Sequence, residues 1–217
     1  KKVIDTTYRD VRQTAGTSKE VYAWNMTNKS LAPFVYTTPE KVADKEEISG
    51  TDSVKYTVTQ DIPYEYSEFY YNGYVFKDEI ADCFAIKTVK VKDVNNVDRT
   101  SWFNVVIDGS EITATATSNA VSNSAFYNNT LTFEIDVQKK EGYDIQPWMK
   151  GKKCVIPNKA IVTISSKDAM YHSRTENLES NIANVNCTFD IRTSITNGTI
   201  TETRLKQPAG SNQSVTF

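Results

Sequence analysis

The chain has 217 residues and a formal net charge of −2, with 25 Lys and Arg against 27 Asp and Glu. This balance excludes the broad basic surface by which proteins bind nucleic acids or anionic membranes. Hydrophobic residues make up 39% of the chain, as in an ordinary globular protein with a packed core. No apolar run approaches the roughly 20 residues that a membrane-spanning helix needs.

Strand patterns dominate the chain. Apolar and polar residues alternate with a period of two in most segments, and Tyr, Phe, Thr, Val and Ile are abundant. Asp108-Gly109 lies between two such segments and predicts a tight hairpin. Helical signals are weak: Ser118–Tyr127 and Tyr143–Lys150 could each hold one short turn. The strands expected in chain order are 54–60, 73–80, 84–91, 102–107, 111–117, 131–137, 155–164 and 183–191.

Short strands at this spacing predict an all-β, Ig-like antiparallel β-sandwich. Residues 15–47 show no clean period and are interpreted as an insertion between early strands, long enough to carry strands of its own. Residues 191–202 predict a second hairpin with an Asn197-Gly198 turn. We therefore expect a sandwich domain over residues 1–188, and a β-hairpin over 189–217 that begins a following module or docks on the first. The start at Lys1, without Met, predicts an excised piece of a longer protein.

The chain has three cysteines, Cys83, Cys154 and Cys187, and a single histidine. None of the cysteines forms a CxxC pair, so the sequence argues against a Cys/His zinc site. We expect no metal and no cofactor. Three buried thiols is the preferred interpretation, because a free cysteine packs as a small hydrophobe. One disulfide plus one free thiol remains the alternative.

Two predicted strands carry a polar residue within an alternating apolar pattern. Asp78 lies in Gly73–Ile80, and Asn158 lies in Ile156–Val162. An acid or an amide on an inward-facing position is costly to bury without a partner. A lysine on a third strand could react with the amide, with help from the acid, and form a Lys–Asn cross-link. Surface positions at strand ends are the alternative for both residues.

The order of several short motifs resembles the isopeptide-forming domains of Gram-positive cell-surface adhesins and pilins, of the collagen-adhesin A type. The resemblance spans roughly residues 1–188, and the tail Thr193–Phe217 resembles hairpins that follow such domains. The motifs are Lys1-Lys-Val3-Ile-Asp5, Val54-Lys-Tyr-Thr-Val-Thr59 with Ile62-Pro63, Val75-Phe-Lys-Asp78-Glu-Ile-Ala-Asp-Cys83, Val89-Lys-Val-Lys-Asp93, Phe126-Tyr127 and Ile156-Pro-Asn158-Lys-Ala-Ile-Val162.

The resemblance implies an intramolecular amide bond between a lysine and an asparagine, assisted by a buried acid. Carried over, Asp78 is the acid and Asn158 is the acceptor, with Asn181 as a second candidate for the acceptor. Lys1 fits the first-strand motif and is the expected amine, and Lys41 is the alternate. The insertion at residues 15–47 departs from the family's pattern and leaves the choice of lysine open.

The resemblance also implies a structural, adhesive or pilin-like module on the outside of the cell, attached to the cell wall, and not an enzyme with turnover. The expected partners are neighbouring domains of the same surface protein and, in addition, a host matrix protein or a glycan. The alternative is a sandwich that binds a carbohydrate or host protein without a cross-link. In that case the binding face would consist of aromatic residues, namely Trp24, Trp102 and Trp148 with the clustered Tyr64, Tyr66, Tyr70 and Tyr71.

Overall fold

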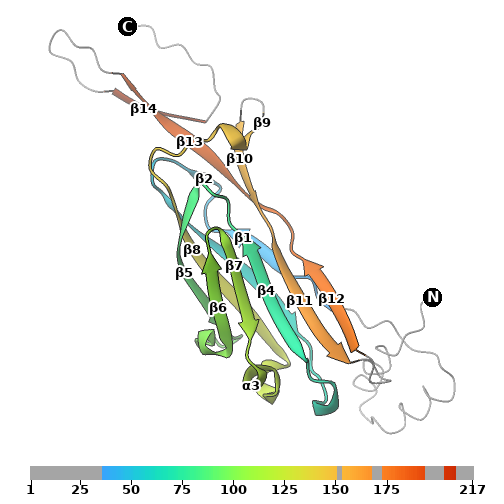
Figure 1. Ribbon diagram of the computed structural model, residues 1–217. Coiled ribbons are helices and arrows are strands. Elements are labelled where there is room, and N and C mark those ends of the chain that lie inside the picture. Colours follow the sequence, from blue (N-terminus) through green and yellow to red (C-terminus); the bar gives the residue numbers. More distant parts are fainter. Residues whose placement is uncertain (1–35, 151–152, 168–172, 194–202, 209–217) are drawn as a thin grey trace.

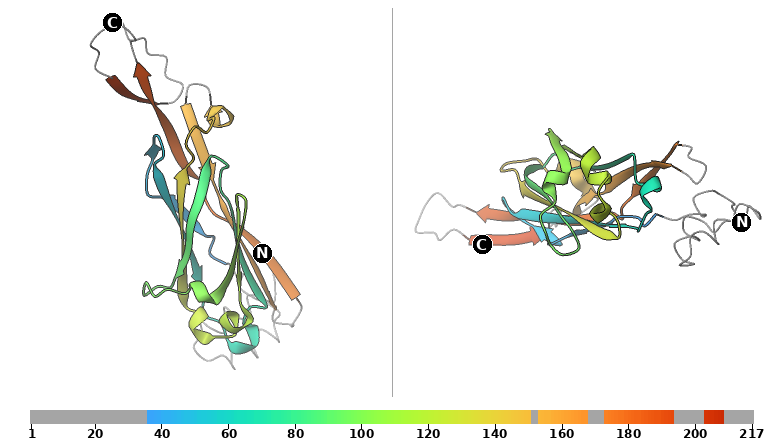
Figure 2. Two further views of the ribbon diagram at one scale, coloured as in Figure 1. Left: turned by 60° about the vertical axis from the view of Figure 1, so that its left-hand side comes forward. Right: turned by 90° about the horizontal axis from the view of Figure 1, so that it is seen from below.

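The computed structural model describes residues 36–150, 153–167, 173–193 and 203–208 (Figure 1). These residues form an elongated all-β sandwich, which confirms the predicted fold class. The one α-helix among them, α3 (Ser118–Val121), lies at one end of the sandwich, and β13 and β14 extend from the opposite end (Figures 1 and 2). No described helix is long and apolar enough to cross a membrane.

Two antiparallel sheets face each other across the core. The first has the order β1-β3-β8-β5, and the second has the order β12-β11-β4-β7-β6. Strands of the first sheet are β1 (Glu40–Ala43), β3 (Ser53–Ile62), β8 (Asn129–Lys139) and β5 (Phe84–Lys92). Strands of the second are β12 (Ser173–Glu179), β11 (Ala160–Lys167), β4 (Gly73–Glu79), β7 (Glu111–Ala116) and β6 (Phe103–Asp108).

A third sheet continues the sandwich toward the end with β14. Its order is β14-β13-β10-β9, and β2 pairs in parallel with β13. Its strands are β14 (Thr203–Pro208), β13 (Ala183–Thr193), β10 (Lys153–Asn158), β9 (Met149–Lys150) and β2 (Glu47–Ile48). Short 3-10 helices connect the strands at Ser67–Phe69, Thr100–Trp102, Ser124–Phe126 and Gln146–Trp148.

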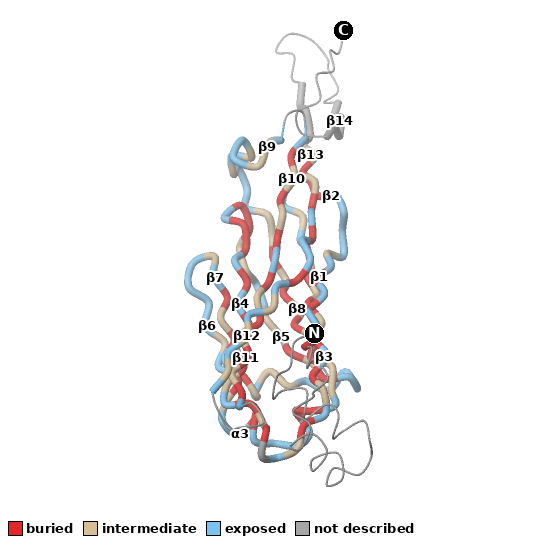
Figure 3. Tube along the Cα trace, turned by 90° about the vertical axis from the view of Figure 1, so that its right-hand side faces the viewer, coloured by how far each residue is buried: buried red, intermediate tan, exposed pale blue. Residues whose placement is uncertain are grey.

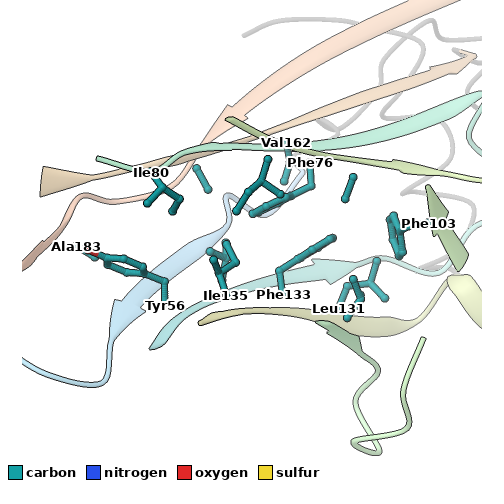
Figure 4. Packing of buried hydrophobic residues seen from close by; sticks show 14 of the residues in the cluster. Tyr56, Phe76, Ile80, Phe103, Leu131, Phe133, Ile135, Val162 and Ala183 are labelled. Atoms are coloured by element: carbon teal, nitrogen blue, oxygen red, sulfur yellow. The ribbon is translucent and has the colours of Figure 1, made fainter. Parts of the chain in front are cut away.

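Alternate side chains of the facing strands build the core. In β3 every second residue from Val54 to Ile62 is buried, and β8 repeats the pattern. Phe76 of β4 stacks on Phe133 of β8 with ring centroids 4.1 Å apart and planes 6° from parallel, so this pair joins the two sheets (Figure 4). The buried residues run along the length of the sandwich (Figure 3). The period-two pattern therefore identified the core correctly.

The predicted strand 155–164 is in fact two strands. β10 ends at Asn158 and pairs with β13, whereas β11 begins at Ala160 and pairs with β4 and β12. The chain thus passes from one sheet to another at Lys159. The adjacent segment, β12 followed by β13, changes between the same two sheets. Burial alternates without interruption from Cys154 to Ser166, so the pattern alone could not reveal the change of sheet.

The other predicted strands are confirmed, and four described strands were missed, namely β1, β2, β9 and β12. β12 has no buried side chain and a polar sequence, so it lacks the apolar alternation that marks a strand. β1 lies within the segment 15–47, and β2 begins at its last residue, Glu47. Residues 15–35 of that segment are outside the described part. The predicted hairpin turn reverses the chain between β6 and β7, with Gly109 in the left-handed region at φ +60°.

At the C-terminal end, β13 and β14 pair as antiparallel strands, with Thr193 opposite Thr203. The Asn197-Gly198 turn lies outside the described residues. β13 runs without interruption across the predicted boundary between residues 188 and 189. The division of the chain into two parts remains a prediction.

All three cysteines are free and buried. Cys154 of β10 lies directly opposite Cys187 of β13. Burial raises the pKa of Cys83 to about 12 and raises the pKa of Cys187. The thiolate is the reactive form of cysteine, so packing protects all three thiols, and the raised pKa gives Cys83 and Cys187 further protection.

We expect the native protein to show no thiol that reacts with a disulfide reagent at neutral pH, and the denatured protein to show three. The measurement is a thiol titration with and without guanidinium chloride, in the absence of reductant. A count of one in the denatured protein would mean that a disulfide is present, and Cys154 and Cys187 would be its members because they are opposite each other.

Candidate functional site

A buried ion pair crosses the interior of the sandwich. The ammonium Nζ of Lys41 on β1 donates a hydrogen bond to Oδ2 of Asp78 on β4, and both side chains are fully buried. β1 belongs to the first sheet and β4 to the second, so the pair connects the two layers. Lys41 is one of the largest fully buried side chains in the described part of the chain. Lysine is almost never buried to this extent without a specific partner.

Strand geometry explains why both side chains point inward. β1 alternates exposed and buried positions, with Glu40 and Val42 outside and Lys41 inside. Asp78 occupies the inward position that follows Phe76 along β4. Nζ of Lys41 also lies 4.9 Å from the centroid of the Tyr56 ring, so an aromatic face supports the cation.

Asn158 completes the group. It is the last residue of β10, is 3% exposed, and lies opposite Ala183 of β13. Burial raises the pKa of the Asp78 carboxyl, and the side-chain amide of Asn158 is close enough to oppose part of that rise, as Lys41 does. Three buried atoms of this group, however, have no hydrogen bond of normal geometry within the described part of the chain. They are Nδ2 and Oδ1 of Asn158 and Oδ1 of Asp78. Buried polar atoms in this state raise the free energy of the folded protein.

Burial moves the two ionisable groups toward their neutral forms. Loss of solvent lowers the pKa of Lys41, and the contact with Asp78 opposes this change. Loss of solvent likewise raises the pKa of Asp78, opposed by Lys41 and then by Asn158. The charged pair and the pair of neutral amine and carboxylic acid are therefore closer in free energy here than in water.

A surface pocket of about 420 Å³ reaches the site from one side. Asp78 and Asn158 lie in its wall, together with Pro157, Lys159 and the exposed Ile182. Lys41 is not among the lining residues. A small molecule released at Asn158 could leave by this pocket.

Asn181 has a different role from the one considered in the sequence. The backbone N–H of Lys41 donates to its Oδ1 at 2.7 Å, and its Nδ2 donates to the carbonyl oxygen of Lys41 at 2.8 Å. Both polar atoms of the amide are thus engaged by the Lys41 backbone and not by its amine. This arrangement favours Asn158 over Asn181 as an acceptor.

Of the residues predicted for the site, the structure brings together Asp78, Asn158 and the alternate lysine Lys41. Lys1, the lysine preferred from the sequence, lies outside the described residues. β1 has no clear strand signal in its residues, so the sequence alone could not show that Lys41 faces the core. It also contained no sign of the contact between Asn181 and β1, because that contact joins residues 140 positions apart.

Two other clusters are explained by the fold. Tyr70 stacks on Tyr127 with ring centroids 4.1 Å apart, and the backbone N–H of Tyr71 donates to the Tyr127 hydroxyl at 2.7 Å. Of the four tyrosines considered as a binding face, Tyr64 is exposed and Tyr71 is buried. Tyr70 and Tyr71 therefore contribute to packing, and the half-buried Trp102 and Trp148 also pack against the core. Trp24 lies outside the described residues.

In the turn that follows β5, the side chain of Asp93 accepts hydrogen bonds from groups of the same turn. Asp93 accepts hydrogen bonds from the backbone N–H groups of Asn95 and Val97 at 2.9 Å, and from Nε of Arg99 at 2.8 Å. These bonds lower the pKa of the Asp93 carboxyl. Asp93 therefore has a structural role in this turn.

Several solved structures are similar to this chain in fold. No protein-family model matches the chain, and no curated protein matches it in sequence. Similar solved structures include the full-length major pilin SpaD from Corynebacterium diphtheriae (19% identity, TM-score 0.54, covering 71% of this chain and 35% of SpaD). Another is BcpA, the major pilin subunit of Bacillus cereus (20% identity, TM-score 0.50, covering 71% and 41%).

A third similar structure is the N-terminal domain of the Streptococcus gordonii adhesin Sgo0707 (13% identity, TM-score 0.52, covering 69% of this chain and 32% of that one). In each case the matched region is less than half of the other protein's chain. At these identities the likeness concerns the fold. The chain has the β-sandwich fold found in pilin and adhesin domains of Gram-positive bacteria.

Proposed function

We propose that the chain is a structural, adhesive module of a bacterial cell-surface protein, locked by an autocatalytic amide bond between Lys41 and Asn158. Asp78 assists the reaction. The observation that carries the proposal is the fully buried Lys41–Asp78 ion pair beside the buried amide of Asn158. The solved pilins and adhesins that share the fold support the cell-surface role.

The reaction begins with a proton transfer inside the ion pair. Lys41 gives a proton to Asp78 and becomes a neutral amine, which is the nucleophilic form. Burial favours this step, since it lowers the pKa of Lys41 and raises that of Asp78. The protonated Asp78 can then donate a hydrogen bond to the amide oxygen of Asn158 and make its Cγ more electrophilic.

The amine of Lys41 attacks Cγ of Asn158, and the bond from Cγ to Nδ2 breaks. The proton lost from the attacking nitrogen goes to the leaving nitrogen, which departs as ammonia, and Asp78 keeps the proton from the first step. The surface pocket beside Asn158 gives the ammonia a way out. Because the fold holds the reactants in place, positioning alone can supply roughly 7–11 kcal/mol of the barrier.

The product would be a covalent link between β1 and β10. It would close a loop of roughly 120 residues, for which the chain-entropy model of cross-links gives about 5 kcal/mol of stabilisation. It would also remove the buried charge pair, and it would replace the buried NH2 group of Asn158 with a single amide N–H. The reaction happens once in each molecule and leaves a permanent link. This suits a module that is under tension on the outside of the cell wall, and not an enzyme.

The partners we propose are the neighbouring domains of the same surface protein. A host matrix protein or a glycan is a further candidate partner, in keeping with the adhesin among the similar structures. These assignments follow from the proposed role of the module.

We expect the purified protein to be lighter than its sequence mass by one ammonia, and a linked peptide to contain Lys41 and Asn158. Asn158→Ala and Lys41→Met should each have their full sequence mass. Lys1→Ala is the matched control and should still lose ammonia. The measurements are intact mass and peptide mapping. Full mass in the wild type would overturn the cross-link and favour a binding sandwich without one, and a linked peptide with Lys1 would move the bond to the other lysine.

The charge state of Asp78 gives a second prediction. In Lys41→Met no bond can form and the buried acid loses its cation, so the folded-state pKa of Asp78 stays above the ordinary value of 3.8. The folded state then binds the proton more tightly than the unfolded state. Stability is therefore highest at acid pH and falls as the pH rises from about 4 to the folded-state pKa, by about 1.4 kcal/mol for each pH unit.

Urea unfolding of Lys41→Met at a series of pH values measures this slope. The double variant Lys41→Met/Asp78→Asn is the control, and it should lack the loss of stability between pH 4 and neutral pH. Identical pH profiles for the two variants would show that Asp78 is not buried as an acid.

A further inference from the structure

We propose that the corner between β12 and β13, residues 180–183, positions the reacting groups, and that Asn181 is the positioning residue for Lys41. This inference rests on the proposed cross-link. It concerns residues that make no contact with the reacting atoms themselves but fix the strands that carry them.

The first contact is with the lysine strand. β1 has four residues, lies at the edge of its sheet and pairs with β3 alone. The Asn181 amide bonds both the N–H and the C=O of Lys41, at 2.7 and 2.8 Å, and so takes the place of a neighbouring strand at that one residue. A short edge strand is otherwise prone to local opening, which would let the lysine leave the core.

The second contact is with the strand beside the acid. Ser180 donates its N–H to the carbonyl oxygen of Ala160 at 2.9 Å, and the N–H of Ala160 donates to Oγ of Ser180 at 2.9 Å. Ala160 is the residue of β11 that lies directly opposite Asp78 on β4. The hydroxyl of Ser180 also donates to the carbonyl oxygen of Asn181 at 2.8 Å, which stiffens the corner.

The third contact is with the acceptor. Ala183, the first residue of β13, lies directly opposite Asn158. A segment of four residues therefore contacts the strand of the amine, the neighbour of the acid and the strand of the amide. It lies where the chain changes sheets, so no regular ladder of backbone hydrogen bonds could hold all three strands there.

Asn181→Ala should therefore slow bond formation without abolishing it, because every reacting group is still present. A misplacement of about 1 Å can reduce a rate 100-fold, so we expect a decrease of about 10- to 100-fold. Asn181→Asp keeps an acceptor for the Lys41 N–H but loses the donor to its carbonyl, and should give an intermediate rate. Asn184→Ala is the matched control, since Asn184 is an exposed residue of β13 opposite Pro157.

Each variant is recovered under denaturing conditions as chain without the bond and is then refolded. The rate of bond formation is measured as the loss of ammonia, followed by intact mass. Circular dichroism recorded in parallel gives the rate of folding. We expect Asn181→Ala to fold at a rate close to that of Asn184→Ala but to lose ammonia more slowly. Equal rates of ammonia loss in these two variants would overturn the proposal.

A second measurement does not depend on the bond. In the Asn158→Ala background, which cannot cross-link, Asn181→Ala should increase hydrogen exchange in Glu40–Ala43 relative to Asn184→Ala. If this increase occurs but the wild type keeps its full mass, the cross-link fails and the positioning of Lys41 stands. If exchange in β1 does not change, the positioning role fails, whatever the wild-type mass.

Discussion

The buried contact between Lys41 and Asp78 connects the two facing sheets and forms the centre of the candidate site. Each partner comes from a different sheet, and each would be costly to bury alone. A charged pair inside a sandwich adds little stability over an apolar pair of the same volume, whereas the loss of one partner costs several kcal/mol. The pair is therefore hard to explain as a device for stability, and its position beside Asn158 suggests a chemical reason for its presence.

The surrounding topology explains how one acid, one amine and one amide come together. Asn158 is the last residue before its strand moves to another sheet, and Asp78 lies opposite the first residue after that change. The same change of sheet in the β12–β13 segment brings Asn181 to the edge strand that carries Lys41. Backbone pairing is interrupted at these points, and side chains of the corner replace it.

Much of the fold was predictable, because the core obeys a simple period. Residues such as Val54, Tyr56 and Val58 alternate with polar neighbours, and their strand formed as expected. Asp78 and Asn158 could be selected because they interrupt that alternation with polar groups. The lysine could not be selected in the same way: β1 is only four residues long, and its burial depends on contacts with residues far along the chain.

β13 links the sandwich to the part of the structure that extends from it. Its first half pairs with β10, and its second half pairs with β14 beyond the end of the sandwich (Figure 1). A pull on β14 along the strand direction would load the β13 ladder in shear, so that several backbone hydrogen bonds must break together. β13 is one continuous strand across these two halves, so the extension follows on from the strand direction within the sandwich.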